Sequence, residues 1–187
     1  LDCLKTKLPK NAFIEFKNLK KKFQMNSELI ATRKASNLAI DSLSKNIPFL
    51  FGGSADLTES NLTKSENQKV FNKKNSKGTY IYFGVREHAM VASLTGMSLH
   101  GGITPYGGTF LIFTDYCKPS IRLASIMKQK IIYIMTHDSI GLGEDGPTHQ
   151  PIEHLASLRA IPNLNVFRPC DSIETLECWE IALKENK

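Results

Sequence analysis

The sequence predicts an α/β protein built on a doubly wound, mostly parallel sheet with helices on both faces. Strand-like and helix-like segments alternate at short intervals along the chain, which is typical of parallel strands joined by helical crossovers. Residues 130–136 are apolar almost throughout, as expected of a strand that is covered on both faces. With 187 residues, of which 41% are apolar, the chain has enough material for one large domain with a sizeable core.

The N-terminal part of the chain shows no regular pattern. Residues 1–26 contain Pro9 and seven lysines without a clear period, so we expect a linker that leads into a domain formed by residues 27–187. A helix is predicted to open at Ser27 and to end before Pro48, because apolar residues recur at helical spacing between them.

The middle of the chain is expected to hold two strands. Residues 47–51 form the first, which ends at the Gly52-Gly53 pair, and residues 79–83 form the second. The loop over 54–63 is rich in small hydrogen-bonding residues directly after a strand, as ligand-binding loops often are. Residues 104–108 are predicted to be a short connection.

The remaining elements follow from periodicity and from proline positions. Helices are predicted over residues 86–99, 110–128, 151–160 and 172–183, and strands over 130–136 and 165–168. The first of these helices has no charged residue between positions 89 and 97, so we expect it to be buried. Phe110, Phe113 and Tyr116 recur every three residues, which places their rings on one helical face. Such a stripe is more often core packing than the wall of a cofactor site.

Composition limits the class of protein. The four cysteines, at positions 3, 117, 170 and 178, have neither zinc-site spacing nor the pattern of a secreted disulfide framework, so we expect no metal site in this chain and a cytoplasmic location. No apolar run approaches the roughly 20 residues that span a bilayer. The net charge of +6 is concentrated in residues 5–22 and 64–77, which is typical of solvated surface, so we expect neither nucleic acid nor membrane as a partner.

Glu87 stands where a predicted strand turns into a predicted helix. The carboxyl ends of parallel strands are where ligands bind in such folds. An acid in this apolar neighbourhood is either paired with Arg86 or another cation, or it performs chemistry that needs a raised pKa. On spacing alone, the ion pair is the better interpretation.

A glycine pattern suggests a second kind of site. Gly141, Gly143 and Gly146 satisfy G-x-G-x-x-G after a strand and before a helix, and Asp171 lies about 25 residues further on, so a dinucleotide-binding oxidoreductase domain is one hypothesis. Against it, acidic residues at positions 144 and 145 would lie beside a pyrophosphate, and Pro147 lacks the N–H donor that such a site needs.

Five motifs, taken together and in order, resemble transketolase. They are Ala-Thr-Arg-Lys-Ala-Ser at 31–36, Gly-Gly-Ser-Ala-Asp-Leu at 52–57, Gly-Val-Arg-Glu at 84–87, Tyr-Gly-Gly-Thr-Phe at 106–110, and the long stretch from Thr136 to Pro151. The resemblance covers nearly everything from residue 27 onward, but only the middle, pyrimidine-binding module of that longer enzyme. Leu1 in place of methionine, and a final segment that stops within a helical pattern, also suggest part of a longer chain.

The resemblance implies roles for residues near the cofactor thiamine diphosphate. Glu87 matches the carboxyl group that hydrogen-bonds N1′ of the pyrimidine and so lets the cofactor's own imino group act as a base. Phe110, Phe113 and Tyr116 match the aromatic pocket around that ring. Asp56 and Leu57 match positions near the thiazolium, although helix capping explains Asp56 about equally well. The residues that hold magnesium and the diphosphate belong to the family's preceding module.

The resemblance also implies roles toward phosphorylated sugars. Arg33, Ser60 and His137 match residues that bind the phosphate end of the sugar, for which a cation and hydrogen-bond donors are suited. Asp145 matches a residue that recognises a substrate hydroxyl, and His149 matches one that assists proton transfer near the reacting carbon.

The implied reaction is transfer of a two-carbon ketol unit from a ketose phosphate to an aldose phosphate, as in the pentose phosphate pathway. In the family the cofactor lies between two subunits, so we expect a homodimer and an inactive isolated chain. These motifs do not separate transketolase from dihydroxyacetone synthase. A non-catalytic assembly module remains a further alternative, against which the intact Glu87, Asp145 and His149 argue.

Overall fold

The computed structural model describes residues 4–26 and 29–185, and its centre is a parallel sheet. The strands are β1 (Leu50–Ser54), β2 (Tyr80–Tyr82), β3 (Thr104–Phe110) and β4 (Ile132–Thr136), in the order β2-β1-β3-β4. The chain passes from β1 to β2 on one side and then to β3 on the other side of β1. The strand order therefore reverses between β1 and β3, which is where such sheets bind ligands.

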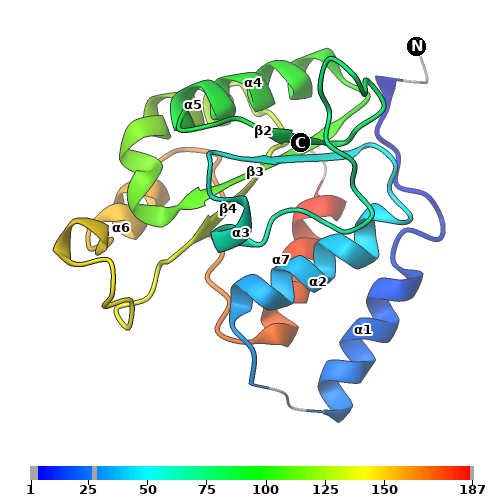
Figure 1. Ribbon diagram of the computed structural model, residues 1–187, viewed down its shortest axis with the longest axis horizontal. Helices are drawn as coiled ribbons and strands as arrows, with labels where there is room; N and C mark the ends of the chain where they lie inside the picture. Colours follow the sequence, from blue (N-terminus) through cyan, green and yellow to red (C-terminus); the bar gives the residue numbers. More distant parts are fainter. Residues whose placement is uncertain (1–3, 27–28, 186–187) are drawn as a thin grey trace.

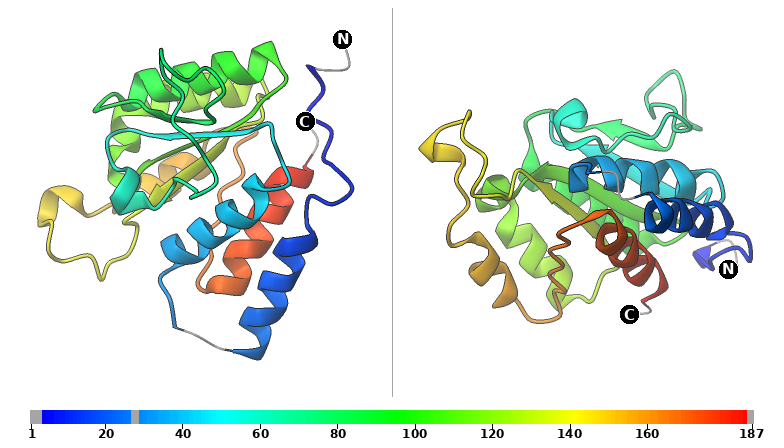
Figure 2. Two further views of the ribbon diagram at one scale, coloured as in Figure 1. Left: turned by 45° about the vertical axis from the view of Figure 1, so that its right-hand side comes forward. Right: turned by 90° about the horizontal axis from the view of Figure 1, so that it is seen from below.

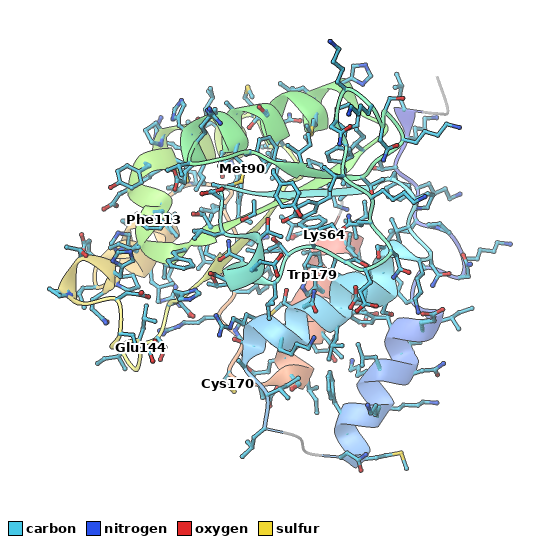
Figure 3. The ribbon with its side chains drawn as sticks, viewed as in Figure 1. Lys64, Met90, Phe113, Glu144, Cys170 and Trp179 are labelled. Atoms are coloured by element: carbon cyan, nitrogen blue, oxygen red, sulfur yellow. The ribbon has the colours of Figure 1, made fainter. Side chains whose placement is uncertain are left out.

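Helices cover both faces of the sheet, as predicted (Figure 1). On one face lie α1 (Ile14–Met25), α2 (Thr32–Ser44) and α7 (Ser172–Lys184), and on the other lie α4 (Glu87–His100), α5 (Thr114–Ile126) and the short α6 (His154–Arg159). Each face has its own core. Ile40 and Trp179 belong to the first, where Trp179 of α7 reaches Ser36 of α2, and Met90 and Ile121 belong to the second (Figure 3).

The segment predicted as a linker contains α1. Phe16 and Phe23 lie seven residues apart on one face of this helix and are 0% and 6% exposed, because they pack against the core formed with α2 and α7. The lysines between them hide this two-turn repeat in the sequence. Ile14–Met25 is therefore a packed helix rather than an irregular segment, whereas the division of the chain at residue 27 stays a prediction.

Residues 104–108, predicted as a connection, belong to the central strand β3, all of whose residues are buried. Proline and glycine disguise this strand, but packing requires the glycines. A side chain at Gly107 would come within 2.5 Å of Leu94 in α4. In β1, which spans Leu50–Ser54 rather than 47–51, a Cβ at Gly52 would lie 2.0 Å from the ring of Tyr106. Glycine therefore allows β1, β3 and the helices to approach closely rather than ending the strand.

The other predicted elements differ from the observed ones mainly at their ends. Ser27 lies outside the described residues, and α2 begins at Thr32. The helix predicted over 110–128 begins only at Thr114, after a short 3-10 turn, η2 (Leu111–Phe113), and the one predicted over 151–160 shortens to α6. The last helix agrees closely with prediction.

Two burial predictions were wrong. The helix α4 buries Met90, Val91 and Leu94 but exposes Ala89, Ala92, Gly96 and other residues of its opposite face. The strand β4 lies at the edge of the sheet and is only half buried up to Met135, and residues 165–168 form no strand beside it. A cavity of about 1050 Å³ borders β4 and residues 163–169 instead.

Within the described residues, no helix is long and apolar enough to cross a membrane.

Candidate active site

The carboxyl ends of the four strands bring the predicted site residues to one edge of the sheet. Each strand contributes a group: Asp56, Leu57 and Ser60 follow β1; Glu87 follows β2; Phe110, Phe113 and Tyr116 end and follow β3; His137, Asp145 and His149 follow β4. Arg33 comes from the first turn of α2. The candidates therefore come from the edge of the sheet at which the strand order reverses between β1 and β3.

Glu87 is the first residue of α4 and is only 7% exposed. The turn before it depends on Gly84, whose φ of +69° is readily adopted by glycine. The guanidinium of Arg86 turns back to the carbonyl oxygen of Phe83, at 3.0 Å. Among the described residues the carboxylate of Glu87 has neither a hydrogen bond nor an ion pair, so the predicted pairing with Arg86 is wrong. A buried acid without a partner favours a ligand that supplies one.

Cys117, in α5, shows which side Glu87 faces. Burial raises the pKa of its thiol to about 12, and the nearby carboxylates of Glu87 and then Asp115 contribute to the rise. The thiol lies 3.7 Å from the carbonyl oxygen of Phe113. The carboxylate of Glu87 therefore lies near the Cys117 thiol, where α4 packs against α5.

The three aromatic residues form a continuous stack. The rings of Phe110 and Phe113 are 5.5 Å apart and nearly parallel at 6°, and those of Phe113 and Tyr116 are 5.8 Å apart at 30°. The prediction that one helix carries all three is wrong, since Phe110 is the last residue of β3 and Phe113 belongs to η2. Burial falls along the stack, from 7% exposure at Phe110 to 64% at Tyr116. We call Glu87, Phe113 and Tyr116 the Glu87 corner.

A second corner joins Arg33, Ser60 and His137, and we call it the Arg33 corner. One nitrogen of the Arg33 guanidinium donates to the backbone oxygen of Ser60 at 3.1 Å and lies 3.4 Å from Nε2 of His137. The residues predicted to act together on a phosphate are thus neighbours, although Ser60 participates through its backbone.

The ring of His137 is held tightly in this corner. It stacks on Phe110 with centroids 3.6 Å apart, and its backbone φ of +55° is unusual for a residue other than glycine. Burial, and next the charge of Arg33, lower the pKa of the imidazole, while Asp145 and Asp138 act in the opposite direction. These effects together favour the neutral form of the His137 imidazole.

The loop after β4 carries Asp145 and His149 and projects from the body of the molecule (Figure 2). His149 meets the ring of Phe113 edge-on at 5.4 Å, which brings it to the Glu87 corner. Asp145 is exposed, and its charge acts on His137. The third glycine of G-x-G-x-x-G leads only into a 3-10 turn, η3 (Pro147–His149), rather than into a helix, so a pyrophosphate would meet no helix N-terminus here.

Asp56 and Leu57 lie at the exposed end of β1. Asp56 has a φ of +65° and does not cap the short helix α3 (Thr58–Asn61), whose N-cap residue is Leu57 and lacks a side-chain cap, so the capping explanation is wrong. The backbone N–H of Leu57 donates to Ser54 Oγ at 3.3 Å.

Two buried residues that tie His137 to the sheet escaped the sequence analysis. Thr136 bonds both Asn61 and His137 through its hydroxyl group. The only signal in the sequence was that Asn61 lies in the loop of small hydrogen-bonding residues and that Thr136 ends a strand.

Comparison with known proteins agrees with this geometry. Residues 28–187 match a family model described as the pyrimidine binding domain of transketolase. The chain is 60% identical over 154 residues to a transketolase of Cereibacter sphaeroides, covering 82% of this chain and 23% of that one, and 58% identical over 157 residues to one of Sinorhizobium medicae, covering 84% and 23%. It superimposes on a transketolase from Leishmania mexicana with a TM-score of 0.84 and 54% identity, over 89% of this chain and 25% of that structure.

The chain spans about a quarter of the length of these relatives. Its match to the domain model and its identity to the relatives extend over most of its own residues, and the dinucleotide-binding alternative is not favoured. The chain therefore belongs to the transketolase family and contains that family's pyrimidine-binding domain.

Proposed function

We propose that this chain forms the pyrimidine side of the active site in a thiamine-diphosphate-dependent transketolase. The reaction would transfer a two-carbon ketol unit from a ketose phosphate to an aldose phosphate. The observation that carries the proposal is Glu87, a buried carboxyl group at the carboxyl edge of the sheet without a partner among the described residues. A ring nitrogen that shares a proton with this group would give the carboxylate the partner that it lacks among the described residues.

The residues of the Glu87 corner fit an aminopyrimidine ring. Glu87 would hold a proton at N1′, and Phe113 and Tyr116 offer apolar ring faces beside it, while Phe110 supports the stack from below. When bound, thiamine diphosphate supplies a thiazolium carbon that loses a proton and carries the two-carbon unit. Asp56 and Leu57 would lie toward that thiazolium. Magnesium and the diphosphate would be held by another module.

The Arg33 corner and the loop after β4 would bind the sugar phosphate. Arg33 and His137 are placed to meet the phosphate, with Ser60 beside them. Asp145 would accept a hydrogen bond from a substrate hydroxyl. His149, against Phe113, would move a proton at hydroxyls close to the reacting carbon.

A homodimer in the cytoplasm is the setting that fits best, and the sugar phosphates would be those of the pentose phosphate pathway. The support for a dimer is the uncovered face of α4, where Ala89, Ala92 and Gly96 lie at the surface. Large apolar side chains on or beside α4 and α5 are also exposed: Tyr82, Val85, Leu99, Tyr116, Leu123 and Ile126. A surface of this kind is typical of an interface. A partner subunit would cover it and close the Glu87 corner.

A domain exchange tests the proposal. Residues 28–187 of this chain would replace the pyrimidine-binding domain of the Cereibacter sphaeroides transketolase, and ketol transfer would be measured with and without thiamine diphosphate and magnesium. We expect cofactor-dependent transfer by the chimera and none by the isolated chain. A chimera that folds and dimerises but stays inactive at saturating cofactor would contradict the proposal.

A further inference from the structure

A buried chain of hydrogen bonds runs from the Arg33 corner into the centre of the sheet. Thr136 Oγ1 lies 2.8 Å from Nδ1 of His137 and 2.6 Å from Oδ1 of Asn61. Asn61 Nδ2 is 3.3 Å from Ser54 Oγ, which in turn is 3.1 Å from the carbonyl oxygen of Gly108 in β3. Thr136, Asn61 and Ser54 are 7%, 0% and 0% exposed, so water does not compete for these bonds.

At the Arg33 end of this series of hydrogen bonds, the donor and the acceptor of each bond can be assigned in only one way. A guanidinium has no acceptor, so Arg33 must donate at its contact with His137, and Nε2 of His137 must accept through its lone pair. The single proton of the neutral imidazole then lies on Nδ1. Nδ1 donates to Thr136, and the hydroxyl of Thr136 is left to donate to Oδ1 of Asn61.

At the Ser54 end, the hydrogen bonds independently require the same assignment of donors and acceptors. Ser54 Oγ accepts from the backbone N–H of Leu57 and from Asn61 Nδ2, and it donates its one proton to the oxygen of Gly108. If the amide of Asn61 were reversed, Ser54 would have two acceptors and only one proton to donate. The amide orientation and the tautomer of His137 are thus determined from both ends.

We propose that Asn61 and Thr136 are positioning residues that hold His137 as the neutral Nδ1–H tautomer, with the Nε2 lone pair directed at Arg33. His137 on its own is then an acceptor at the place where the phosphate of a sugar would bind.

A consequence for substrate follows, and it rests on the proposed function. A phosphate dianion that attracts Arg33 takes away the donor at Nε2 and presents acceptor oxygens instead. Nε2 then takes up one proton from solvent and donates to the phosphate, while Nδ1 keeps its bond to Thr136. The other charged groups that act on His137 are Asp138, Asp145 and His149; the two carboxylates favour this protonation, and His149 opposes it.

Nitrogen-15 NMR of the 187-residue chain tests the tautomer directly, with the His137 signals assigned by their loss in His137→Gln. Above the pKa, we expect Nδ1 to show the shift of a protonated ring nitrogen and Nε2 that of an unprotonated one. In Thr136→Val the two shifts should converge as both tautomers become populated. Thr136→Ser keeps a hydroxyl and should restore the wild-type pattern, even if Thr136→Val fails to fold. An Nε2–H form in the wild type, or convergence in Thr136→Ser as well, would overturn the proposal.

Inorganic phosphate tests the consequence. The His137 titration would be followed in phosphate and in sodium chloride of equal ionic strength. We expect its midpoint to rise in phosphate for the wild type and to stay unchanged for Arg33→Ala. If the Nδ1–H tautomer is found but phosphate leaves the midpoint unmoved, the proton uptake and the role proposed for the Arg33 corner are both wrong, while the positioning by Asn61 and Thr136 stands.

Discussion

The Arg33 corner and the Glu87 corner differ in how far their side chains find partners within the described residues. In the first, Arg33 contacts both Ser60 and His137, and buried hydrogen bonds lead from His137 to β3. In the second, the carboxylate of Glu87 has no partner among the described residues, and Tyr116 is 64% exposed. Both corners lie at the same edge of the same sheet.

Under the proposed function, the difference separates the half of the ligand that one domain could recognise alone from the half that needs a partner. Polar groups are directional and satisfy one another over short distances, so a few residues from α2, α3 and β4 suffice for the Arg33 corner. An apolar pocket must instead be enclosed, because its strength depends on the area removed from water. The exposed face of α4 and the outer end of the ring stack are the surfaces that enclosure would use.

The largest effect should come from disturbing the strand contact that both corners share. In Gly52→Ala the added methyl would lie 2.0 Å from Cζ and 2.3 Å from the hydroxyl oxygen of Tyr106, whose ring is fully buried between β1 and the helices. We expect a loss of about 3 kcal/mol in the free energy of unfolding, as for strongly overpacked cores. Urea denaturation of the isolated chain measures it. A loss below about 0.5 kcal/mol would mean that β1 and β3 are not packed this closely.

Glu87→Gln separates the corners functionally. In the chimera, an amide cannot share a proton with a ring nitrogen as a carboxylic acid does, so we expect kcat to fall on the order of 10²-fold or more with saturating cofactor. The melting temperature should hardly change, because the carboxylate makes no hydrogen bond within the described chain. Near-normal turnover would remove Glu87 from the chemistry.

The sequence predicted what depends on chemical type and position along the chain. The fold class, the helix after Gly84, the last helix and the gathering of Arg33 with His137 all agreed with expectation. The residues that follow the strands could be grouped into one site because a parallel sheet places the carboxyl ends of its strands at one edge. This grouping does not depend on the exact boundaries of the strands.

What the sequence hid depends on close packing between distant segments. The strand β3 contains proline and two glycines, and small residues are needed there and in β1 because side chains from distant segments pack against them. These side chains are Tyr106, Phe83, Leu94 and Thr63. Likewise, Phe16 and Phe23 look like scattered aromatics until α2 and α7 provide the surface that buries them. The burial of α4 was overestimated because small residues such as Ala89, Ala92 and Gly96 carry no charge and yet lie exposed.

His149→Ala should act on turnover at the boundary between the corners. Its ring contacts Phe113 only edge-on, so we expect cofactor affinity to change little while kcat falls on the order of 10²-fold, as for other positioned acid–base groups. Kinetics of the chimera with varied cofactor and sugar phosphate would separate the two. Equal loss of cofactor binding and turnover would place His149 in the Glu87 corner alone.

Arg33→Ala tests whether the Arg33 corner binds the phosphate of the sugar. Loss of a charge-assisted contact should raise KM for phosphorylated sugars roughly 10-fold and leave kcat within a few-fold. Erythrulose, a ketose without a phosphate, is the control: its KM should not respond. If both substrates weaken alike, Arg33 supports the structure of the site rather than binding phosphate.

Gly96→Ala probes the exposed face of α4 beside the Glu87 corner and should have the smallest effect. We expect it to stabilise the isolated chain but to weaken the dimer of the chimera. Gly96 lies in the middle of α4, and a Cβ there would have no neighbour within 4 Å. Alanine favours a helix over glycine by about 1 kcal/mol, so the isolated chain should become more stable by up to that amount.

In the chimera the same methyl would lie on the face that we propose the partner covers, so the dimer should dissociate more readily. Gly143→Ala, which is equally unobstructed but lies in the loop after β4, is the matched control and should leave dimerisation unchanged. Sedimentation velocity over a dilution series measures the dimer. Unchanged dimerisation in Gly96→Ala would show that this face of α4 is not where the second subunit closes the site.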